Sequence, residues 1–179
     1  MVRLLVTTSP STVKIKDKDK NTPLHSAVEC LETSKEAVVG ILMEADPENF
    51  AAQQKDREGN LPIHSACELA EPNGAVVSML ADTFPGGLQQ KDKDGNLPVH
   101  SALEVAKDAM PVEVIRKMLD MFPGAVKVKD KDKNTILHSA LECLDRNMEE
   151  VVAMIMEADP ETFAAQQKDR EGNWPVHSA

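Results

Sequence analysis

The stretch KDKDGNLPVHSALEVA at residues 91–106 decides the fold, because versions of it recur along the whole chain. Its histidine is one of five in the sequence, and each of the five is followed by Ser and Ala. They lie 36 to 39 residues apart, at His25, His64, His100, His138 and His177. Chance does not place every histidine of a chain in one frame, so the sequence is an array of repeats.

The repeat frame extends over residues 1–179, which we interpret as one repeat array. Residues 1–15 are the tail of a truncated repeat, and residues 168–179 are the start of another. Between them lie four complete repeats, at 16–54, 55–90, 91–128 and 129–167. The segment MEADPENFAAQQKDREGN at 43–60 returns with one change at 156–173, which indicates duplication of a three-repeat block. We therefore expect the chain to come from a longer array.

Every repeat follows the same physical plan. A charged turn comes first, then a short helix, a polar connector, and a second helix that carries the heavier apolar face. Proline suits the first helical position, because its φ is fixed and its missing N–H costs nothing there. It opens every short helix except that of 129–167, at Pro23, Pro62, Pro98 and Pro175. No stretch alternates with period two, so the sequence predicts an all-α fold without a sheet.

The pattern D-x-x-G-x-[TL]-P-[LIV]-H-x-A resembles the ankyrin repeat, and it fits best at Asp92, Gly95, Pro98, Val99, His100 and Ala102. The period is longer than the usual ~33 residues, and Lys20 and Lys133 replace the turn glycine in two repeats. The resemblance implies an ankyrin-like solenoid of stacked helix-turn-helix repeats joined by charged turns. It also implies that each histidine is structural, with its ring hydrogen-bonded to the backbone of the adjoining turn.

Charge and composition argue against several classes of function. A net charge of -10 disfavours nucleic acid as a partner, and no apolar run approaches the ~20 residues of a membrane span. Motifs for catalysis or cofactor binding are absent, so we expect no enzymatic activity and no cofactor. Cysteines without paired spacing indicate reduced, buried thiols and an intracellular, cytoplasmic protein; they are Cys30, Cys67 and Cys143.

Two metal sites can be considered, and we expect neither. The histidines recur about one repeat apart, whereas a metal needs ligands that converge on one point. The turn residues Asp92, Asp94 and Asn96 have the alternate spacing of a calcium loop. The twelfth position of that loop is Leu103, however, and not the bidentate Glu that calcium requires.

Two sets of charged residues are candidates for partner binding. The resemblance places the Glu that follows each histidine by four residues on a concave groove, where stacking would align Glu29, Glu68, Glu104 and Glu142 as an acidic stripe. Such a stripe favours a partner with a basic or amphipathic segment, although a solvated helix face is the simpler interpretation. The turn tips are the second surface, at Lys18, Asp19, Arg57, Glu58, Lys93, Asp94, Lys131 and Asp132. Neighbouring tips can also form a salt-bridged ladder, which would stabilise the array little.

The leading functional hypothesis is a non-enzymatic module that binds a partner protein through its concave helix face and turn tips. The similarity of the tips from repeat to repeat keeps a second hypothesis open, in which the array is a passive structural spacer. A third is that the array regulates a larger protein whose catalytic domain lies outside these residues.

Overall fold

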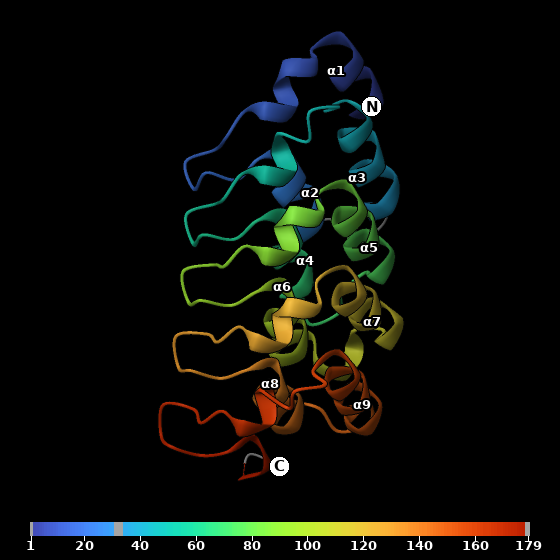
Figure 1. Ribbon diagram of the computed structural model, residues 1–179. Helices are drawn as coiled ribbons and strands as arrows, with labels where there is room; N and C mark the ends of the chain where they lie inside the picture. Colours follow the sequence, from blue (N-terminus) through green and yellow to red (C-terminus); the bar gives the residue numbers. More distant parts are fainter. Residues whose placement is uncertain (1, 31–33, 178–179) are drawn as a thin grey trace.

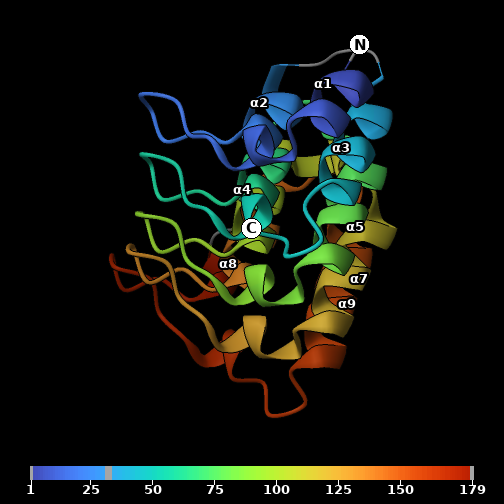
Figure 2. The same ribbon diagram turned by 90° about the horizontal axis from the view of Figure 1, so that it is seen from above.

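The computed structural model describes residues 2–30 and 34–177, and the described part of the chain is entirely helical, without strands (Figure 1). The prediction of an all-α fold is therefore confirmed. Helix pairs lie side by side in chain order along one axis, and the turns project together from one side of them (Figure 2).

The helices form two parallel rows. The first row holds the short helices that follow the charged turns: α2 (Pro23–Cys30), α4 (Pro62–Cys67), α6 (Pro98–Ser101) and α8 (Ile136–Cys143). The second row holds the helices with the heavier apolar faces: α1 (Val2–Thr8), α3 (Lys35–Glu44), α5 (Gly74–Thr83), α7 (Val112–Met121) and α9 (Met148–Ala158). Neighbouring helices within each row pack on one another, and α2, α4 and α8 pack on α3, α5 and α9 of the other row.

Short tight segments complete each repeat. A 3-10 helix follows each second-row helix, at η1 (Pro10–Lys14), η2 (Ala51–Gln53), η3 (Pro85–Gln89), η6 (Pro123–Lys127) and η7 (Ala164–Gln166). In the third repeat, α6 continues as a π-helical segment, η4 (Ala102–Ala106), and a 3-10 turn, η5 (Lys107–Ala109). The last described element is the 3-10 turn η8 (Pro175–His177).

The core is a single apolar seam between the two rows. Val28, Leu103, Ile115 and Ile155 are each at most 1% exposed, and the buried cluster runs without a break from Val6 onward. A helix pair this small cannot cover its own apolar faces, so each repeat depends on its neighbours. No helix in the described ranges is long and apolar enough to cross a membrane.

Contacts between repeats recur with the three-repeat block. Residue numbers in the two copies of the block differ by 113. The ion pair between Lys14 and Glu48, at 2.7 Å, returns between Lys127 and Glu161 at 2.8 Å. Because Arg3 and Glu44 likewise correspond to Arg116 and Glu157, two ion pairs of one repeat interface are repeated at another.

The turns keep one backbone shape although their sequences differ. Gly59 and Gly95 adopt φ values of 83° and 82°, which glycine tolerates best. Lys20 and Lys133 occupy the same position at 67° and 66°. Replacement of the glycine by lysine therefore leaves the left-handed turn in place, at a cost of about 1–2 kcal/mol for each lysine.

Candidate partner-binding groove

His25 and His64 link the start of their own short helix to the chain at the next charged turn. The Nδ1 atom of His64 accepts the backbone N–H of Leu61 at 3.2 Å, and Nε2 lies 3.1 Å from the carbonyl of Gln90, the residue that precedes the next charged turn. The Nδ1 atom of His25 accepts the N–H of Thr22 at 3.2 Å, and its Nε2 lies 3.2 Å from the carbonyl of Asn60 within the next charged turn. An Nδ1 that accepts requires a neutral ring with the proton on Nε2, so Nε2 is the donor to the carbonyl.

Burial keeps these rings neutral. It lowers the pKa of His64 and His100 to about 4, and it also lowers the pKa of His25 and His138. Among the described residues, Nε2 of His100 and His138 has no hydrogen-bond partner. The ring of His177 is exposed, and its Nδ1 accepts only a long contact from Trp174, at 3.4 Å.

The lysine that opens each turn forms a ladder that the sequence analysis missed. Its ammonium group reaches the backbone carbonyl of the equivalent lysine in the following turn. Lys16 contacts Lys55 at 3.4 Å and Lys129 contacts Lys168 at 3.3 Å, and the same bond joins Lys55 to Lys91 and Lys91 to Lys129. The signal was the recurrence of Lys at this position in all five turns.

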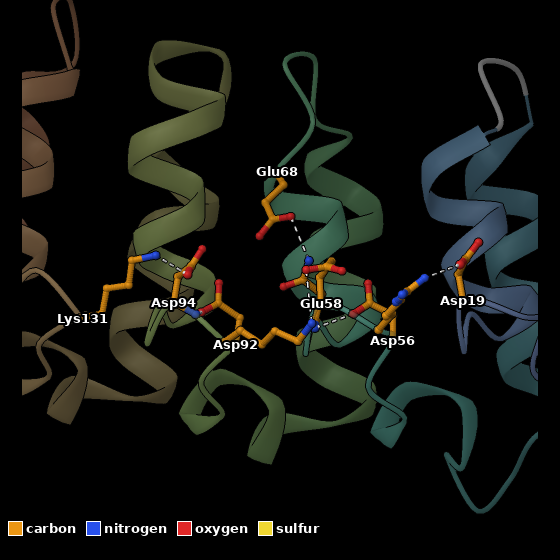
Figure 3. Close-up of polar contacts among 10 residues, drawn as sticks. Asp19, Asp56, Glu58, Glu68, Asp92, Asp94 and Lys131 are labelled. Atoms are coloured by element: carbon orange, nitrogen blue, oxygen red, sulfur yellow. Dashed lines mark hydrogen bonds and ion pairs between the residues drawn. The ribbon is translucent and has the colours of Figure 1, made fainter.

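The turn tips form a second ladder, as drawn for part of the array in Figure 3. In each step a backbone N–H of one tip donates to a carbonyl of the preceding tip, and the side chains of the same two residues form an ion pair. The pairs are Arg57–Asp19 at 3.7 Å, Lys93–Glu58 at 3.2 Å, Arg170–Asp132 at 3.2 Å, and Lys131–Asp94. Most of the predicted tip residues therefore contact the neighbouring repeat while remaining open to solvent; Lys18 instead lies near Asp19 of its own turn.

The aspartate near the start of each turn is engaged by the turn itself. Oδ1 of Asp92 accepts the backbone N–H groups of Asp94 at 2.7 Å and Asn96 at 2.8 Å. The calcium-loop spacing is thus the spacing of a hydrogen-bonded turn. Within the described ranges, no group of three or more His, Cys, Asp or Glu side chains is arranged to hold a metal ion.

The four glutamates of the predicted stripe divide into two kinds. Glu29 and Glu142 are exposed, whereas Glu68 and Glu104 are half-buried. Glu68 accepts hydrogen bonds from Asn60 Nδ2 at 3.1 Å and from Ser101 Oγ at 3.3 Å. Glu104 accepts one from Ser139 Oγ at 2.8 Å. The serine after the histidine therefore binds the glutamate of the preceding repeat.

Carboxylates from the turns and the short helices alternate along one surface, which we call the acidic groove: Glu29, Asp56, Glu68, Asp92, Glu104, Asp130, Glu142 and Asp169. Burial is the main reason why the pKa of Glu68 is raised to about 7, and the neighbouring carboxylates raise it further. The hydrogen bond from Ser101 lowers this pKa, but by less than burial raises it. Burial raises the pKa of Glu104 in the same way, against the bond from Ser139. The middle of the groove thus resists the accumulation of negative charge.

The groove opens into two hollows that match residue for residue. The first is lined by Asp19, Asn21, Glu29, Asp56, Arg57 and Glu58. The second is lined by the residues with numbers 113 higher, together with Asn173 and His177. Each hollow presents four carboxylates and one arginine, and that arginine is already paired with an aspartate of the preceding tip.

Cys67 is buried and Cys143 is half-buried, both are free thiols, and burial raises the pKa of each. The side chain of Cys30 lies outside the described residues. A role for the groove must be inferred from its geometry, because the chain matches no protein-family model and no curated protein.

Proposed function

We propose that the chain is an ankyrin-like repeat array that binds a basic segment of a partner protein in its acidic groove. The observation that carries the proposal is the duplicated hollow, in which four carboxylates face one arginine at two places along the groove. Like charges held close together repel one another, and cations from a partner would relieve that repulsion. Binding of this kind involves no chemical step and no cofactor.

The chemistry of the groove selects the partner. Its polar lining offers hydrogen-bond acceptors in excess, which suits the guanidinium and ammonium groups of Arg and Lys. The two equivalent hollows favour a segment with two basic clusters, or two separate segments, because each hollow presents the same residues. Electrostatic contacts at exposed positions affect association rate and salt dependence most strongly, so the interaction should weaken as salt rises.

Binding to a labelled peptide of eight arginines tests this proposal. The double variant Glu29→Gln, Glu142→Gln removes one exposed carboxylate from each hollow, and neither residue makes a described hydrogen bond. The matched control is Glu113→Gln, Glu150→Gln, which removes the same charge from exposed positions on the second-row helices α7 and α9. We expect the groove variant to bind about fivefold more weakly at moderate salt, and the control to bind like the unmodified protein.

Equal weakening in the two variants would mean that only net charge matters, and the groove would not be the binding site. Capture of partners by the full chain, compared with capture by the groove variant, then identifies which proteins depend on the hollows.

A structural spacer is the second candidate function, and the two ladders between turns favour it. Each turn is tied to the next by a lysine-to-carbonyl bond and by an ion pair at the tip, for example Lys93 to Glu58. An array that serves only as a spacer would show no specific affinity for the peptide: the unmodified protein, the groove variant and the control variant would all bind it equally weakly. A binding module would instead lose affinity in the groove variant alone.

A further inference from the structure

Glu68 and Glu104 differ from the other carboxylates of the acidic groove in how they are held. Glu29 and Glu142 are exposed in the two hollows, whereas the central pair is half-buried and accepts hydrogen bonds from a serine of the next repeat. Figure 3 shows Glu68 on its helix above the turn carboxylates Asp56 and Asp92. Both central residues therefore sit where the groove joins two repeats.

The charged groups that act on these two residues are carboxylates on every side. Asp56 faces Glu68 from its own turn, Asp92 from the next turn, and Glu29 from α2. Glu104 is faced by Asp92, Asp130 and Glu142. Within the described ranges no lysine or arginine forms an ion pair with either residue, so neither has a cation that would stabilise its ionised form.

We propose that Glu68 and Glu104 are a proton-controlled switch at the centre of the acidic groove, in which the two half-buried carboxyl groups exchange a proton for a cation of the partner when the partner binds. This inference rests on the proposed function. The neutral carboxyl avoids repulsion from its neighbours, and its O–H can donate to the serine hydroxyl that otherwise donates to it. When a guanidinium or ammonium group approaches, the carboxyl proton leaves for solvent and the carboxylate pairs with the new cation.

Proton release makes binding depend on pH with a definite sign. Burial and neighbouring charge raise the pKa of Glu68 to about 7, and pairing with a cation would lower it again. Binding of the partner must then remove a proton that the free protein holds, which weakens binding at low pH. Affinity for the partner therefore increases with pH. For one such group the increase is roughly tenfold between pH 6 and pH 8. A further contribution from Glu104 would add to it.

Two measurements test the switch. The first uses free protein: carbon NMR of the glutamate carboxyl groups, titrated from pH 4 to pH 9 and assigned with Glu68→Gln and Glu104→Gln. We expect the Glu68 signal to titrate near neutral pH. The second is calorimetry with the eight-arginine peptide at pH 6, 7 and 8, in two buffers of different ionisation enthalpy. Both are made in a His177→Gln background, which removes the imidazole from the second hollow.

The outcomes separate the switch from the proposed function. Proton release that disappears in the double variant Glu68→Gln, Glu104→Gln, but persists in Glu29→Gln, Glu142→Gln, supports the switch. Binding that does not change with pH, or carboxyls that titrate like ordinary glutamates, overturns the switch and leaves the proposed function standing. Absence of peptide binding at every pH overturns both.

Discussion

Replacing His64 by alanine measures how strongly the histidine couples its short helix to the segment that leads into the next turn. The ring is fully buried, accepts the N–H of Leu61 at 3.2 Å and contacts the carbonyl of Gln90 at 3.1 Å. Alanine would leave the buried N–H of Leu61 without a partner, at a cost of roughly 1–3 kcal/mol, and would also remove the contact with the part-buried carbonyl of Gln90. The space left by the imidazole adds to this cost, so we expect a total loss of about 3–5 kcal/mol.

The exposed His177 provides a matched control within the same chain. Its ring has only the 3.4 Å contact with the N–H of Trp174, so His177→Ala should change stability by less than about 1 kcal/mol. Urea denaturation followed by circular dichroism at pH 7 compares the two variants with the unmodified protein. Equal stability of the two variants would refute the coupling role of His64.

The pH dependence gives an independent check of the same residue. Because burial lowers the pKa of His64 from 6.5 to about 4, the unfolded chain binds more protons than the folded chain between these two pH values. Stability therefore falls as pH falls through this window, and His64→Ala should lose part of that fall. A variant with the full acid sensitivity of the unmodified protein would contradict the burial of a neutral ring.

Three further substitutions follow from the structure. Glu68→Gln should stabilise the protein at pH 8 by about 1–2 kcal/mol and should have little effect at pH 5. The effect at pH 8 is smaller than the full pKa shift implies, because the residue is half-exposed. Equal effects at both pH values in urea denaturation would contradict the raised pKa. Asp108→Ala removes a carboxylate that accepts three backbone N–H groups of residues 145–147 and should cost about 1 kcal/mol, which an unchanged midpoint of denaturation would disprove. Lys133→Gly places glycine at a φ of 66° and should raise stability by about 1 kcal/mol; a lower melting temperature would show that the lysine is not strained.

The sequence predicted those features that depend on one repeat at a time. Proline at the start of the short helices and the apolar spacing of the second helices were sufficient to place Pro98 at the start of α6 and to bury Ile115 and Met118. These features follow from local backbone preference and from helical periodicity. The π-helical segment at 102–106 had no such local signal, and we have no physical account of it.

Contacts between repeats were harder to predict, because they depend on the rise and rotation from one repeat to the next. A lysine at the start of every turn is visible in the sequence. Its bond to the carbonyl of the next lysine could be predicted only if the distance between two turns were known. The half-burial of Glu68 has the same origin, since Ser101 of the following repeat covers it. The sequence therefore indicated the acidic stripe without separating its buried members from its exposed ones.

The ladders give a physical reason for the similarity of the turns. A tip residue such as Asp94 contacts Lys131 of the following turn through both its backbone carbonyl and its side chain. A substitution in one turn therefore disturbs its contacts with the following turn. Such positions cannot vary independently, and their similarity does not count against a binding function. The connectors between the helices differ freely, with LAEPN at 69–73, KDAMP at 107–111 and LDRN at 144–147. If the groove supplies a general attraction for basic segments, selectivity among such partners must come from these variable connectors beside it.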